Sequence, residues 1–104
     1  MGPIEVRVPH QLEPAEARRR IDRGIERAQS EFGDRVTRID AAWQEDDRLG
    51  IEVEVMGMTI TSDLAVAPGE IVVRLNLPGM ARLFAGRIRS GIEEKLGGLL
   101  AAPA

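Results

Sequence analysis

Residues 48–65 read RLGIEVEVMGMTITSDLA, and this stretch decides the fold class. Apolar and polar residues alternate on both sides of Gly57, which is the pattern of two strands that each bury one face. Gly57 permits a tight reversal of the chain, so we expect the two strands to pair as antiparallel neighbours. The strands are predicted at 48–56 and 58–65, with these residues facing inward: Leu49, Ile51, Val53, Val55, Met58, Ile60 and Leu64.

The same alternation continues on both sides of this hairpin. The acidic segment Gln44–Asp47 and the dipeptide Pro68-Gly69 are turn signals that join the hairpin to two more strands. Connections this short exclude the crossovers that parallel strands need, so the four central strands are predicted to form an antiparallel meander. A fifth strand near the N-terminus ends at Pro9. The strands beyond the hairpin are predicted at Pro3–Val8, Val36–Trp43 and Ile71–Leu77.

Two other segments show the 3.6-residue period of amphipathic helices. The first is expected to begin at Pro14 and to stop at Gly33, and the second to open at Pro78-Gly79 and to fray at Gly97-Gly98. Gly24 inside the first helix indicates close packing against the sheet. The apolar stripes consist of Ala17, Ile21, Ile25, Ala28 and Phe32 in the first helix, and of Met80, Leu83, Phe84, Ile88, Ile92, Leu96 and Leu99 in the second.

The order of these elements is β-α-β-β-β-β-α, which predicts an α+β fold. Each strand has one apolar side, as a two-layer sandwich requires, so we expect a mostly antiparallel sheet with both helices on one face. A chain of 104 residues has room for a single domain, 1–104, of which residues 101–104 are predicted to form a loose C-terminal tail.

Composition narrows the class of protein and its compartment. The chain has no cysteine, which removes disulfides and thiolate metal ligands and fits a reducing interior. Residues 1–10 lack the basic start and the apolar run of a secretory signal, and no stretch approaches the roughly 20 apolar residues of a transmembrane helix. We therefore expect a cytoplasmic protein without a transmembrane segment.

The net charge of −3 is distributed unevenly along the chain. From Asp40 to Glu70 there are eight acidic residues and one basic residue, Arg48, whereas residues 16–27 contain five arginines and three acids. The pattern indicates basic helices and an acidic sheet. Nucleic-acid binders usually add aromatic stacking residues, and the three aromatic residues here all fall on inward-facing stripes. We expect no nucleic-acid partner.

The residues that usually carry catalysis are scarce. His10 is the single histidine, cysteine and tyrosine are absent, and no serine lies in the strand-turn-helix setting of a nucleophile. The acids at 45–47 lack the spacing of a calcium loop, and the glycines form no phosphate-binding motif. We expect no enzyme, no metal and no cofactor, and we interpret His10 as a corner residue that hydrogen-bonds the backbone. An enzyme that uses His10 in a small pocket is the remaining alternative.

The end of the last helix has two interpretations. Its apolar stripe can cover the sheet as core, or the part from Ile92 to Leu100 can extend past the sheet and dock on a hydrophobic surface or a second copy of the chain. The candidate binding surface consists of Arg82, Arg87, Arg89, Leu96, Leu99 and Leu100.

Residues 4–12 (IEVRVPHQL), followed by 15–18 (AEAR), resemble the opening of the putative polyhydroxyalkanoic acid system protein family. The Pro9-His10-x-Leu12 element is the distinctive part, and the likeness extends to 92–96 (IEEKL) in the terminal helix, so that it covers nearly the whole chain. The resemblance implies a role in the storage of polyhydroxyalkanoate, an intracellular bacterial polyester. It implies no catalytic residue, and His10 is the motif residue that it singles out.

The first hypothesis, which the resemblance implies, is a non-enzymatic accessory protein that binds the polyhydroxyalkanoate granule or a granule-bound protein through the last helix. The alternative is a small homodimeric protein-binding module that pairs with a second chain through an exposed strand edge or the back of the sheet. The residues expected on the back of the sheet are Thr59, Thr61, Val72 and Arg74.

Overall fold

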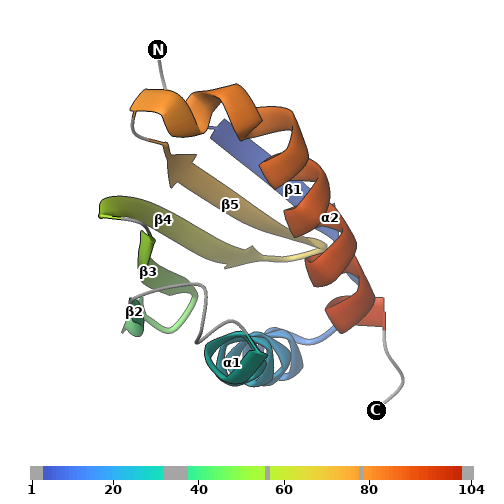
Figure 1. Cartoon of the computed structure of the whole chain (residues 1–104). Helices are drawn as coiled ribbons and strands as arrows, with labels where there is room; N and C mark the ends of the chain where they lie inside the picture. Colours follow the sequence, from blue (N-terminus) through green and yellow to red (C-terminus); the bar gives the residue numbers. More distant parts are fainter. Residues whose placement is uncertain (1–3, 32–37, 56, 78, 102–104) are drawn as a thin grey trace.

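The described part of the chain folds into one five-stranded antiparallel sheet with two α-helices on the same face (Figure 1). A computed structural model describes residues 4–31, 38–55, 57–77 and 79–101. The α+β class and the order of the elements are as predicted. The elements are β1 (Ile4–Pro9), α1 (Pro14–Glu31), β2 (Arg38–Glu45), β3 (Arg48–Val55), β4 (Met58–Ala67), β5 (Glu70–Asn76), a 3₁₀ helix η1 (Gly79–Phe84) and α2 (Ala85–Ala101).

The strand order in the sheet is β1-β5-β4-β3-β2, so that β1 and β2 form its two edges. The turn sets the register of the central hairpin: Gly57 has a φ of 78°, in the left-handed region that favours glycine, and Val55 pairs with Met58 beside it. Further along the hairpin Leu49 pairs with Leu64. The described side chains of the set predicted to face inward, Leu49, Ile51, Val53, Met58, Ile60 and Leu64, therefore stand on one face, because side chains alternate along a strand with a period of two.

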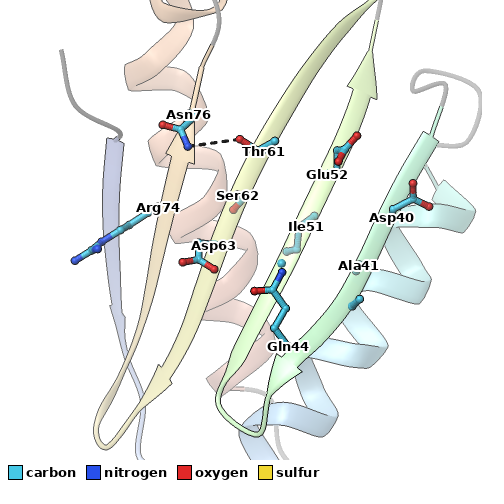
Figure 2. Close-up of a pocket in the computed structure, with 12 residues that line it drawn as sticks. Asp40, Ala41, Gln44, Ile51, Glu52, Thr61, Ser62, Asp63, Arg74 and Asn76 are labelled. Carbon is cyan, nitrogen blue, oxygen red and sulfur yellow. Dashed lines mark hydrogen bonds between the residues drawn. The ribbon is translucent and has the colours of Figure 1, made fainter.

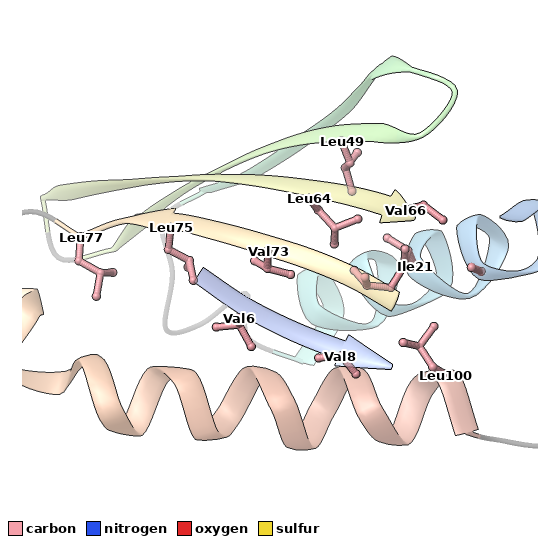
Figure 3. Packing of buried hydrophobic residues seen from close by; sticks show 12 residues of the cluster. Val6, Val8, Ile21, Leu49, Leu64, Val66, Val73, Leu75, Leu77 and Leu100 are labelled. Atoms are coloured by element: carbon pink, nitrogen blue, oxygen red, sulfur yellow. The ribbon is translucent and has the colours of Figure 1, made fainter. Parts of the chain in front are cut away.

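The core lies between this face of the sheet and the two helices (Figure 3). α2 packs along β1, while α1 packs near β4 and contacts α2. Each aliphatic side chain that is fully buried here contributes roughly 1.5–3 kcal/mol, so the apolar stripes, more than helix propensity, hold both helices against the sheet. The buried hydrophobic residues are Val6, Val8, Ala17, Ile21, Leu49, Leu64, Val66, Ile71, Val73, Leu75, Leu77 and Leu100.

The last helix differs from the prediction at both ends. Residues 79–84 form a 3₁₀ helix and the α-helix begins at Ala85, so Leu83 and Phe84 leave the predicted core stripe. At the other end the helix does not fray at Gly97-Gly98 but continues to Ala101, which was expected to begin a loose tail. The remaining parts of the predictions that concern Pro3, 32–37, Met56, Pro78 and 102–104 lie outside the described residues.

Gly24 marks a close contact, as predicted, but its partner is the other helix and not the sheet. A Cβ atom placed on Gly24 would lie 2.8 Å from Cδ2 of Leu99 in α2. This distance is shorter than real Cβ contacts allow, so the absence of a side chain at position 24 lets the two helices approach.

Candidate functional site

Two large apolar side chains are exposed just before the last α-helix. Leu83 is 77 % exposed and Phe84 is 54 % exposed, and they are the large hydrophobic residues left exposed in the part of the chain that the structure describes. Both belong to η1, which lies at the end of the molecule where β5 ends, far from the C-terminal end of α2 (Figure 1). We call Leu83, Phe84 and the nearby Arg87 the η1 platform.

Helix geometry explains why neither side chain reaches the core. Successive residues of a helix point about 100–120° apart, so two adjacent residues cannot both follow one narrow stripe. Ala85, Ile88 and Ile92 pack on the core, and the 3₁₀ geometry that ends at Phe84 turns Leu83 and Phe84 away from it, although Phe84 lies four residues before Ile88. Adjacency of two large apolar residues is not a signal for such a surface, because Leu99 and Leu100 form the same kind of pair and are half-buried and buried.

The η1 platform lies in a basic stretch of an acidic chain. Residues 79–91 contain three arginines and no acidic residue. Arg87 is exposed and has no hydrogen bond or ion pair with another described residue. Arg89 is exposed as well and donates a hydrogen bond from Nη1 to the carbonyl oxygen of Glu5 at 2.7 Å, at the outer edge of β1. Arg82 is half-buried and takes part in an interaction within the fold.

The three leucines of the predicted binding surface are buried or half-buried in the structure. Leu100 is only 5 % exposed and belongs to the core, and Leu96 and Leu99 are half-buried. The expectation that the segment from Ile92 to Leu100 extends past the sheet is therefore wrong. Its end is covered because α1 crosses it, with Arg20 donating hydrogen bonds to the carbonyl oxygens of Leu99 and Leu100. The predicted arginines and the predicted leucines do not form one surface.

The face of the sheet opposite the helices carries charged side chains that pair with one another. Arg7 lies 3.2 Å from Glu5 and 2.6 Å from Glu70, and Arg74 lies 3.0 Å from Glu5. Hydrogen bonds from Arg74 and Arg7 hold the pKa of Glu5 below its ordinary value, and the same contact with Glu5 raises the pKa of Arg7. The other ion pairs on this face join Arg38 to Asp40 and Glu52, and Arg48 to Asp63.

A shallow, open depression lies in the middle of this face (Figure 2). Gly50 lacks a side chain there, and the amide of Gln44 fills part of the space: a Cβ atom on Gly50 would lie 2.6 Å from Gln44 Nε2. Arg74 and Asp63 line the depression, and both are already held in ion pairs. Among the described side chains no buried polar atom lacks a hydrogen-bond partner. The residues expected on the back of the sheet all lie on this face: Thr59, Thr61, Val72 and Arg74.

His10 has the structural role predicted for it. Its Nδ1 accepts a hydrogen bond from the backbone N–H of Leu12 at 3.0 Å, and its Nε2 lies 3.0 Å from the carbonyl oxygen of Ala67. Since a carbonyl only accepts, the ring must carry its proton on Nε2. The backbone N–H of His10 also donates to the carbonyl oxygen of Gly69 at 2.9 Å. The residue is 8 % exposed; Nδ1 holds the β1–α1 corner together, while Nε2 and the backbone N–H tie this corner to the end of β4 and to the β4–β5 turn.

The basic face of α1 is partly structural. Arg20 is 7 % exposed and binds the end of α2, so it does not contribute to a solvent-facing basic patch. Arg18 lies over the ring of Trp43, 4.4 Å from its centroid, and the indole Nε1 of Trp43 donates to Asp22 at 2.8 Å. These contacts fasten β2 to α1. Arg23 and Arg27 remain exposed.

The described residues also show neither a cluster of metal ligands nor a membrane-spanning helix. No group of three or more histidine, aspartate and glutamate side chains comes together in a way that could hold a metal ion. None of the helices that the structure describes is both long and apolar enough to cross a membrane.

Comparison with known proteins identifies the family of the chain. The comparisons with curated proteins and with solved structures gave no match. A family model described as putative polyhydroxyalkanoic acid system protein matches residues 4–100, which includes every strand and nearly all of α2. The Pro9-His10-x-Leu12 element lies inside this match, and its histidine closes the corner between β1 and α1. The chain belongs to the family of putative polyhydroxyalkanoic acid system proteins.

Proposed function

We propose that the protein is a non-enzymatic accessory protein of the polyhydroxyalkanoate storage system. It acts in the cytoplasm by docking on the granule surface or on a granule-bound partner. The η1 platform is the surface that docks. Family membership supports the biological system, and the observation that carries the mode of action is the exposure of Leu83 and Phe84 beside Arg87.

The distribution of burial supports docking in preference to catalysis. An exposed apolar cluster with a charged rim is the usual mark of an interaction surface. Histidine is the residue type that most often transfers protons in catalysis, but both ring nitrogens of His10 are engaged in hydrogen bonds with the backbone. The depression on the open sheet face is shallow, and its charged side chains are held in ion pairs with residues around it.

Cosedimentation with purified granules tests the proposal. The double variant Leu83→Ser/Phe84→Ser should sediment with granules at least tenfold less than the wild type, because two exposed apolar contacts are lost while the core is untouched. Arg27→Gln is the matched surface control, since Arg27 is exposed on α1, away from η1. Circular dichroism and the fluorescence of the single tryptophan, Trp43, check that each variant is folded. Equal sedimentation of the double variant and the wild type would refute docking through η1.

The second candidate is a small homodimeric protein-binding module. The observation in its favour is the uncovered face of the sheet, on which Thr59, Thr61, Val72 and Arg74 are all accessible at least in part. The ion pairs on that face weigh against it, because the charges are satisfied without a second chain. Light scattering at high protein concentration separates the two candidates: a monomer removes the homodimer and leaves granule docking intact.

A further inference from the structure

We propose that the η1 platform binds an anionic phospholipid surface, into which Leu83 and Phe84 insert while Arg87 and Arg89 lie at the level of the phosphates. This inference rests on the proposed docking function and specifies the chemistry of the surface that is bound. The proposed binding partner is a layer of lipid headgroups. The experiment must distinguish it from an uncharged polyester surface and from a protein partner.

The charges around the platform favour an anionic surface. The chain as a whole carries a net charge of −3, yet residues 79–91 carry three arginines and no acid. The nearest acidic residues that follow in α2 are Glu93 and Glu94, two turns after Arg87 and further from η1. A polyester has ester groups and no charge along its length, so arginines beside the apolar pair would gain nothing from it. The phosphates of a lipid surface attract arginine side chains. Each exposed arginine would raise the partitioning of the protein onto such a surface by about fivefold.

The size and shape of the platform favour a fluid surface over a protein. A stable protein partner covers about 800 Å² with a well-packed apolar centre, whereas the platform offers two adjacent apolar side chains. The depression in the middle of the sheet and a smaller one beside it lie on the face opposite the helices, away from η1. Two apolar side chains with flanking arginines at one end of a molecule suit shallow insertion at the boundary between headgroups and acyl chains.

The geometry of α2 keeps the acidic residues of this helix away from the surface. η1 and the C-terminal end of α2 lie at opposite ends of the molecule (Figure 1). When Leu83 and Phe84 point into a lipid surface, Glu93 and Glu94 are carried away from it along the helix. Arg89 stays near the surface, because its hydrogen bond to the carbonyl oxygen of Glu5 fixes its guanidinium at the edge of β1.

Three kinds of particle test the inference with the full-length chain. The particles are vesicles of phosphatidylcholine alone, vesicles with about one third phosphatidylglycerol, and polyhydroxyalkanoate particles free of protein and lipid. We expect binding to the anionic vesicles, at least tenfold weaker binding to the neutral ones, and a clear loss of binding when salt is raised from about 50 to 500 mM. Leu83→Ser/Phe84→Ser should weaken binding to anionic vesicles more than tenfold and Arg87→Gln about fivefold, while Arg27→Gln stays within about twofold.

Each other outcome overturns the inference in a distinguishable way. Binding to the bare polyester but not to anionic vesicles refutes lipid recognition and leaves granule docking in place. Binding to purified granules that disappears after protease treatment, without vesicle binding, points to a protein partner and also refutes it. Binding to vesicles that does not depend on Leu83 and Phe84 refutes the role of the platform. Absence of binding to granules, vesicles and polyester alike refutes both this inference and the proposed function.

Discussion

Nη1 of Arg20 in α1 donates hydrogen bonds to the carbonyl oxygens of Leu99 and Leu100 in the last turn of α2, each at 3.2 Å. The carbonyl groups at a helix end have no partner within the helix, and here a guanidinium from a neighbouring helix supplies one. The favourable interaction between a cation and the negative end of the helix dipole adds to these bonds. Glu16, one turn before Arg20, lies 3.8 Å from its Nε. This arrangement explains how α2 continues through Gly97-Gly98.

Replacing Arg20 should therefore destabilise the fold. Arg20→Met keeps the apolar stem but leaves partly buried carbonyl groups without a charged donor, and we expect the free energy of unfolding to fall by about 1–3 kcal/mol. Arg19→Met is the control, because the guanidinium of Arg19 is exposed and its loss should change stability by less than about 0.5 kcal/mol. Urea unfolding followed by circular dichroism measures both. Equal effects of the two variants would contradict the capping role.

His10→Ala should affect stability and spare function. It removes an acceptor for the Leu12 N–H and a donor to the Ala67 carbonyl in a buried corner, which should lower the free energy of unfolding by about 1–3 kcal/mol. Gln11→Ala, at an exposed neighbouring position, should be nearly neutral. Granule cosedimentation of the folded fraction should equal that of the wild type. A stable His10→Ala protein that no longer sediments with granules would show that His10 takes part in function.

The contact between Gly24 and Leu99 can be measured as a coupling energy. Alanine at position 24 gains about 1 kcal/mol of helix propensity, but its Cβ atom meets Leu99 Cδ2 at 2.8 Å. In a Leu99→Ala background this collision is gone, so Gly24→Ala should stabilise the variant more than it stabilises the wild type, by at least 0.5 kcal/mol. Chemical unfolding of the wild type, the two single variants and the double variant gives the coupling energy as a double-mutant cycle. Additive effects would show that the helices do not touch at this position in solution.

The pKa of Glu5 reports on the open face of the sheet. Arg74 lowers this pKa most and Arg7 lowers it further, so the Glu5 carboxylate stabilises the folded state above its unfolded pKa, and this contribution is lost as the pH falls through its folded pKa. Arg74→Gln should raise the pKa of Glu5 toward its ordinary value, whereas Arg48→Gln, whose partner is Asp63, should leave it unchanged. NMR titration of the glutamate side chains gives the values. An unchanged pKa in Arg74→Gln would mean that the contact does not persist in solution.

The strands and their faces could be predicted from residues alone because the signal is local. The alternation around Gly57 places Leu49 and Leu64 on the same side, and the structure pairs them directly. The prediction for His10 also succeeded, since a single imidazole between a strand-ending proline and a helix has few partners besides the backbone. The ends of α2 were predicted wrongly, because a periodic stripe does not show where a 3₁₀ turn interrupts it or which neighbour covers its end.

The candidate site, too, could be predicted only in part from the sequence. The sequence indicates the basic flank at 82, 87 and 89, but the leucines of the predicted binding surface face the core or α1. Leu83 and Phe84 belong to the predicted core stripe, but the 3₁₀ helix that ends at Phe84 turns both outward and Ala85 packs on the core. A change of phase within one turn cannot be read from composition or from an averaged period.

The sequence by itself determined the α+β class, the order of the elements and the inward face of each strand, because alternation and helical period act between residues close in the chain. Only the tertiary structure decided that Arg20 closes the end of α2, that Gly24 meets Leu99, and that Leu83 and Phe84 stay outside. The first two are contacts between residues far apart in sequence, and the third follows from how η1 and α2 lie against the sheet. They depend on how the two helices lie across one sheet, which local patterns do not specify.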